Sequence, residues 1–143
     1  MYSFLNPESR PEPVSAQELT ELEERFDLHL PEALKDYYMK YNCQTIKPVC
    51  LRAGQETFEV YGMLPLFSGP MSVDHILEIC QTSNLFGKGC FPFAISAEGD
   101  DFVYDTFTKN IYFVRLDDLH HRQKICTGID HFFYLLNQTA QNS

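Results

Sequence analysis

The fold is decided by the stretch FPFAISAEGDDFVYD, residues 91–105, which predicts two strands joined by a short acidic turn. Apolar side chains alternate with their neighbours on both sides of the turn, and this period of two predicts an antiparallel hairpin with one buried face. Gly99 supplies the positive φ that such a turn requires, while the acidic residues around it keep the loop in water. The alternating residues are Phe91, Phe93 and Ile95 before the turn and Phe102 and Tyr104 after it.

Helical spacing outside the hairpin predicts four helices. Residues 15–18 match a capping box, so the first helix is expected over residues 16–26. A second helix begins at Pro31 and ends at Asn42, a third follows Ser72, and the last begins in residues 127–130. The apolar face expected for the third helix comprises Ile76, Leu77, Ile79 and Cys80.

Further strands complete the expected sheet. They fall at residues 57–61, 63–67 and 111–116, and the polar run 117–122 is interpreted as a surface connection. This order of elements predicts one α+β domain with a mostly antiparallel mixed sheet of about five or six strands and about four flanking helices. The expected division of the chain is an extended lead-in at 1–14, the domain at 15–138 and a polar, frayed tail at 139–143.

The net charge of the chain limits the kinds of partner that it is expected to bind. Twenty Asp and Glu against eleven Lys and Arg leave a formal charge of −9. Such a field repels nucleic acid and anionic membranes and attracts cationic partners, so neither nucleic acid nor membrane is an expected partner. With 44% hydrophobic residues, no long apolar run and no leader at the start, the chain is expected to be globular and cytoplasmic.

Cysteine usage and motifs give no sign of a cofactor. The five cysteines are scattered without a Cys-x-x-Cys pair, so free buried thiols are expected, with a Cys43–Cys50 bridge left open. Neither a Gly-x-Ser-x-Gly nucleophile motif nor a phosphate-binding glycine loop is present. We therefore expect no cofactor and no metal.

Two groups of side chains are candidates for a reactive site. Asp100, Asp101 and Asp105 resemble a cluster for a hard cation, but consecutive strand residues point to opposite faces, which favours turn formation over metal binding. His120 and His121 are the obvious acid–base candidates, but they lie in the polar surface run. An enzyme is not expected.

Two blocks of sequence carry a family resemblance. The first is Leu30-Pro31-Glu32 with Tyr37-Tyr38 and Tyr41-Asn42, and the second is Phe86-Gly87, Phe91–Ala94, Gly99-Asp100 and Tyr104-Asp105. In order and spacing they resemble the SUKH superfamily, which includes yeast cell-wall regulators and many bacterial immunity proteins. The resemblance spans residues 15–137, with Cys43 and Asn110 standing where members often have glycine.

This resemblance implies an α+β fold and, in bacteria, a small cytoplasmic protein that neutralises a cognate toxin, often a nuclease or deaminase. It brings no catalytic residues. The positions it marks as defining the fold are Leu30, Pro31, Tyr37, Asn42, Phe93, Gly99 and Asp105.

Candidate partner-binding residues are acidic or aromatic. Opposite charges speed an encounter, and aromatic anchors supply much of the lasting affinity. The alternative for each acidic residue is a solvated surface, with Glu21 and Arg25 paired along one helix, and for each tyrosine it is the core. The candidates are Glu21, Glu24, Glu98, Asp100, Asp101, Tyr38 and Tyr61.

The leading hypothesis is an immunity protein, a monomer or weak homodimer, that binds and blocks a basic toxin domain without chemistry of its own. The alternative is a regulatory or scaffold domain that binds an endogenous protein.

Overall fold

The computed structural model describes residues 2–83 and 85–142, with all side chains in these ranges except those of residues 119, 120 and 140–142. The helices are α1 (Ala16–Phe26), α2 (Glu32–Tyr41), α3 (Val73–Ser83) and α4 (Ile129–Asn142). The strands are β1 (Val49–Ala53), β2 (Glu56–Val60), β3 (Gly62–Met63), β4 (Cys90–Ile95), β5 (Asp101–Asp105), β6 (Asn110–Arg115) and β7 (Asp118–Thr127). The predicted α+β class is confirmed.

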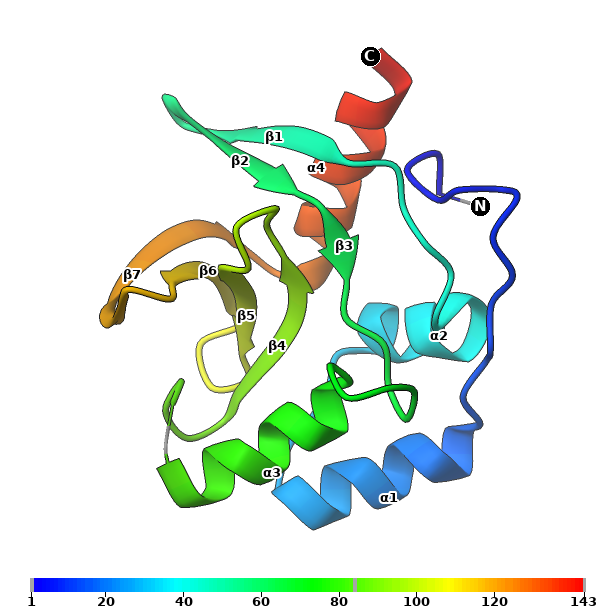
Figure 1. The fold of residues 1–143 in the computed structure, drawn as a ribbon, viewed down its shortest axis with the longest axis vertical. Coiled ribbons are helices and arrows are strands. Elements are labelled where there is room, and N and C mark those ends of the chain that lie inside the picture. The colour runs from blue at the N-terminus through cyan, green and yellow to red at the C-terminus, as the bar shows by residue number, and fades with distance from the viewer. Residues whose placement is uncertain (1, 84, 143) are drawn as a thin grey trace.

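The strands form two antiparallel sheets instead of one mixed sheet. β1 and β2 make a separate hairpin, and the other strands follow in the order β3-β4-β5-β6-β7 (Figure 1). The two sheets remain in contact, because the rings of Phe58 in β2 and Phe113 in β6 lie 5.1 Å apart.

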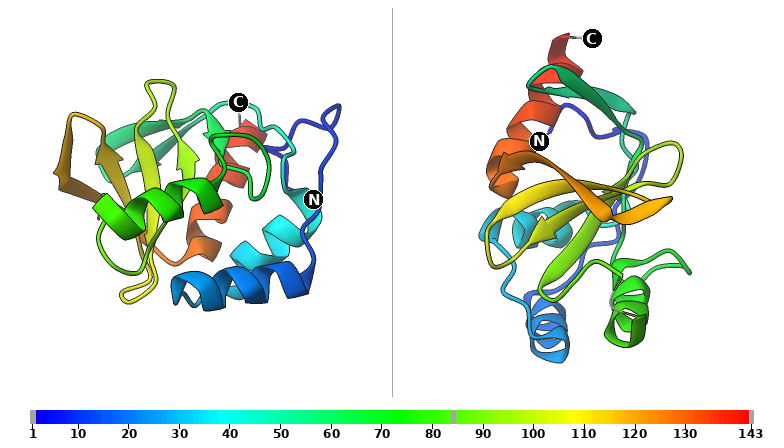
Figure 2. Two further views of the ribbon diagram at one scale, coloured as in Figure 1. Left: turned by 60° about the horizontal axis from the view of Figure 1, so that its bottom comes forward. Right: turned by 90° about the vertical axis from the view of Figure 1, so that its left-hand side faces the viewer.

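Helices cover both faces of the five-stranded sheet (Figure 2). On one face, Phe93 and Phe102 pack against Phe132 of α4, at ring distances of 5.0 and 5.8 Å. On the other face, Val103 and neighbouring residues form a second apolar cluster that includes Ile76 of α3. The predicted half-buried hairpin is therefore wrong in one respect: β4 and β5 are buried on both faces.

The capping box at the start of α1 is confirmed. The Glu18 amide donates to Ser15 Oγ at 3.1 Å, and the Ser15 amide donates to the Glu18 carboxylate at 3.1 Å. These bonds satisfy backbone donors that have no partner inside the helix, and α1 spans the predicted residues 16–26.

Loss of this cap should be measurable. Ser15→Ala is expected to lower the free energy of unfolding by about 1 kcal/mol, because it leaves the Glu18 amide without its side-chain acceptor. Urea denaturation measures the change. Ser83→Ala is the control, since that hydroxyl only returns to the carbonyl of Ile79 in an exposed turn, and a loss as large as that of Ser15→Ala would contradict a specific role for the cap.

The segment before α1 packs onto the domain. Phe4 and Leu5 are buried, and Leu5 forms an isolated antiparallel bridge with Ile46. Ser3 hydrogen-bonds Asn137 of α4, at the opposite end of the chain. At that end α4 continues to Asn142, past the point where the polar tail was expected to fray.

The hydrogen bonds of Asn42 explain why it is one of the fold-defining residues. It ends α2 as predicted, and its side-chain amide donates to the carbonyls of Glu12 and Leu66 and accepts from the Leu66 amide, at 2.8–3.0 Å. The next residue, Cys43, has a φ of +70°, a conformation that favours glycine.

The other fold-defining residues form core or turns. Leu30, Tyr37 and Phe93 are buried, and Pro31 precedes the first turn of α2. Gly99 has a φ of +89° and closes the β4–β5 turn. The Asp105 carboxylate accepts from the amides of Phe107 and Thr108 and so builds the β5–β6 turn.

Three strands and one helix face differ from the expectation. Of the expected strand 63–67, only Met63 lies in a strand, β3. Residues 118–122 of the polar run interpreted as a connection belong to β7, which pairs along β6, and β1 lies in a segment where no strand was predicted. In α3, Ile79 is 55% exposed instead of part of the apolar face, because the side of the helix that packs on the domain carries Ile76, Leu77 and Cys80.

Candidate interaction surface

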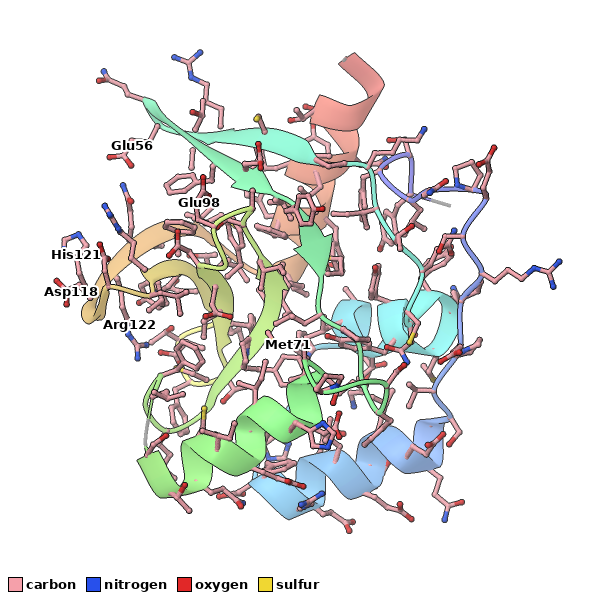
Figure 3. All side chains as sticks on the ribbon, in the orientation of Figure 1. Glu56, Met71, Glu98, Asp118, His121 and Arg122 are labelled. Carbon is pink, nitrogen blue, oxygen red and sulfur yellow. The ribbon has the colours of Figure 1, made fainter. Side chains whose placement is uncertain are left out.

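The acidic candidates lie in separate places. Glu21 and Glu24 are exposed on α1, whereas Glu98 is exposed in the β4–β5 turn, well away from α1 (Figures 1 and 3). Asp100 in that turn is half-buried, and its carboxylate accepts from the Leu116 amide at 2.9 Å. The candidates therefore do not form one continuous surface.

Two of the predicted partner-binding residues are buried. Tyr38 is fully buried, and its hydroxyl donates to the Leu64 carbonyl at 3.0 Å. Asp101 is 8% exposed, because α3 covers the sheet face toward which it points. Both predictions are wrong, whereas Tyr61 is 55% exposed and remains available for contact.

A groove runs between the start of α1 and the loop that precedes α3. It consists of two adjoining cavities of about 180 and 170 Å³ that share Glu18 and Phe67 as lining residues. We name it the α1 groove. Its charged and aromatic lining residues are Glu12, Glu18, Glu21, Arg25 and Phe67.

Phe67 gives the groove an apolar contact point. Its backbone has a φ of +57°, a conformation that bulky side chains rarely adopt, and its amide donates to the buried Asp74 carboxylate at 2.8 Å. The ring nevertheless remains 44% exposed, and Met71 in the same loop is 61% exposed (Figure 3). Backbone strain combined with an exposed aromatic ring is typical of a binding site.

The charges around the groove are mainly negative. Arg25 pairs with Glu78 of α3 and not with Glu21, so the predicted pair within the helix is wrong. Among the ion pairs of the described residues, none involves Glu12, Glu18 or Glu21. Their unneutralised charges favour a cationic partner.

The reactive candidates are not brought together. His121 is exposed on β7 and the side chain of His120 lies outside the described residues. In the described part of the chain, no group of three or more His, Cys, Asp or Glu side chains is arranged to hold a metal ion. All five cysteines are free, and burial raises the pKa of Cys126 to about 11, which keeps that thiol protonated.

Sequence reasoning found only part of this groove. Glu21 was a candidate, but Glu12 and Phe67 were not, because they lie 55 residues apart and meet only through the fold. Phe67 is followed by Ser-Gly-Pro at residues 68–70, which indicates a loop. An aromatic residue in such a loop is only a weak signal of an exposed side chain.

Fold and surface together define a small α+β domain with an acidic groove. The model of the SMI1 / KNR4 family (SUKH-1) matches residues 13–134. The chain belongs to this family, and the resemblance seen in the sequence is confirmed. No curated protein matches the chain significantly. Within residues 2–83 and 85–142, no helix has both the length and the apolar character needed to cross a membrane.

Proposed function

We propose that this protein is an immunity protein that binds and neutralises a basic bacterial toxin domain. SUKH domains are an immunity-protein type of domain and are generally non-catalytic, so membership of this family supports the proposal. The observation that carries it furthest is the α1 groove, where unpaired carboxylates surround the exposed ring of Phe67.

The groove suits the two stages of such a complex. The net charge of −9 attracts a basic domain over a distance and raises the association rate. Once the partner is in contact, Phe67 buries apolar area without first losing much freedom, because its backbone is already held by Asp74. The bound protein then blocks the active site or substrate groove of the toxin.

Charge steering has a direct test in the association rate. The rate constant for binding a basic toxin domain, such as one encoded beside this protein's gene, is expected to fall at least tenfold between about 50 mM and about 500 mM salt. Surface plasmon resonance measures it. A rate that does not change with salt would remove steering from the mechanism.

Matched variants separate the groove from the overall charge. Glu21→Lys should slow association more than Glu98→Lys, although both change the net charge by two, because only Glu21 lines the groove. Phe67→Ala should instead raise the dissociation rate by about tenfold or more. Equal effects of the two charge reversals would place the interface elsewhere.

A further inference from the structure

A second and larger cavity lies between α2 and α4, beside the segment that precedes α1. Its volume is about 580 Å³, and Tyr2, Asp36, Tyr37, Tyr41 and Asp130 form much of its wall. We name it the α2–α4 pocket. It shares no lining residue with the α1 groove.

Three tyrosine rings form one side of this pocket. The ring centroids of Tyr2 and Tyr41 are 5.8 Å apart, those of Tyr37 and Tyr41 are 5.7 Å apart, and those of Tyr2 and Tyr37 are 6.4 Å apart. Phe133 supports the group from α4, at 5.2 Å from Tyr2 and 5.3 Å from Tyr37. Such a set of aromatic rings offers π-faces to a cation.

The hydroxyl of Tyr37 is buried without a partner. The residue is 2% exposed, and no described residue forms a hydrogen bond with its hydroxyl. Burial raises the pKa of Tyr37, and the neighbouring Tyr2, Cys43 and Tyr41 raise it further. A buried hydroxyl that lacks a partner costs free energy, and this oxygen has almost no accessible surface in the free protein. A ligand group that donates to it therefore reaches it only when the rings around it move apart.

Carboxylates from two helices lie beside the rings. Asp36 comes from α2 and Asp130 from α4, and neither takes part in an ion pair among the described residues. Burial raises the pKa of Tyr2, and Tyr41, Asp130 and Asp36 raise it further, in accord with both carboxylates lying near this ring. Lys40 lines the same pocket and offsets part of their charge.

We propose that the α2–α4 pocket binds an arginine side chain of a protein partner. A guanidinium group stacks on aromatic rings, donates to two carboxylates in different directions, and has donors left for a hydroxyl oxygen. The three tyrosines, the pair Asp36 and Asp130, and the unpartnered Tyr37 hydroxyl supply these three kinds of contact. This inference rests on the proposed function in one respect, that the partner is a basic protein.

The test uses the full chain with an untagged N-terminus, because Tyr2 lines the pocket. The probe is Nα-acetyl-arginine methylamide, titrated into the protein and followed by ¹H–¹⁵N NMR. We expect saturable shifts at Tyr2, Asp36, Tyr41 and Asp130 with a dissociation constant in the millimolar range, at least about tenfold lower than for the neutral norleucine analogue. Absence of shifts at these residues, or equal affinity for the two probes, would overturn the proposal.

Four variants make the test specific to the pocket. Asp36→Asn should weaken arginine binding by about tenfold, whereas Asp118→Asn, an exposed change on β7 (Figure 3), should leave it unchanged. Lys40→Gln should strengthen binding, because it removes a competing cation. Tyr37→Phe should weaken binding without lowering the free energy of unfolding, since the lost hydroxyl has no partner in the free protein. If Tyr37→Phe destabilises the protein and binds arginine normally, the hydroxyl has a structural role only, and the proposed contact is wrong.

The titration with the arginine probe needs no toxin, so its result can be compared with a separate test of toxin binding. A pocket that binds the arginine probe while no basic toxin is bound would support this inference and refute the proposed function. A toxin complex that forms normally with Asp36→Asn, together with no probe binding, would refute the pocket and leave the proposed function standing.

Discussion

Asn42→Ala is expected to lower the free energy of unfolding by about 3–4 kcal/mol, and the melting temperature by roughly 10 °C. The Asn42 side chain makes three hydrogen bonds to main-chain groups of Glu12 and Leu66, two of them buried. Its removal leaves those groups without partners, which costs more than the loss of the bonds alone. Urea denaturation followed by circular dichroism measures the change.

The matched control is Asn110→Ala. The Asn110 side chain makes two hydrogen bonds, with Tyr112 and Thr127, and these bonds join side chains that are not fully buried. A loss of only about 1 kcal/mol is expected, because water can replace the missing amide. We call the three hydrogen bonds of Asn42 to Glu12 and Leu66 the Asn42 clamp. Similar losses for the two variants would contradict a specific role for this clamp. Since this clamp also holds Leu66 beside Phe67, Asn42→Ala should weaken partner binding as well.

Asp101→Asn is expected to stabilise the protein increasingly as the pH rises. Burial, and to a smaller extent Asp100, raises the pKa of Asp101 to about 7. Because the folded state keeps this proton while the unfolded state loses it near pH 4, this group makes the folded protein less stable as the pH rises from about 4 to about 7. Asparagine resembles the protonated carboxyl group and removes this dependence.

The difference between the variant and the natural protein isolates this group. Between pH 5.5 and pH 8 the free energy of unfolding of Asp101→Asn should gain about 2 kcal/mol over that of the natural protein. Asp118→Asn, which changes an exposed side chain on β7, is the control and should show no such gain. A constant difference across the pH range would show that Asp101 does not hold a proton in the folded state.

Local patterns predicted much of the fold. The capping box located the start of α1, the apolar spacing of Leu19, Leu22 and Phe26 located its extent, and period-two alternation located β4 and β5. β7 was missed because an edge strand with a polar outer part needs little apolar alternation, and because the Leu116-Asp117 turn that joins it to β6 lacks the glycine or asparagine that signals a hairpin. In β1 the buried Val49 and Leu51 alternate with exposed residues, but Cys50 between them reads as apolar and hides the pattern.

The candidate sites were harder to predict because they are assembled from distant segments. The α2–α4 pocket joins Tyr2, α2 and α4, so its residues come from both ends of the chain. Tyr38 and Asp101 failed as contact residues for a related reason: their burial depends on the loop at Leu64 and on α3, neither of which a local pattern places over them.

Bacterial growth gives the most direct test of the central claim, that this protein acts by binding a basic toxin through its acidic groove. Cells are made to express a basic toxin domain, such as one encoded beside the gene, together with the natural protein or with its Glu12→Lys, Glu21→Lys double variant. The natural protein is expected to restore growth, whereas the folded double variant is expected not to. No restoration by the natural protein, or equal restoration by both, would contradict it.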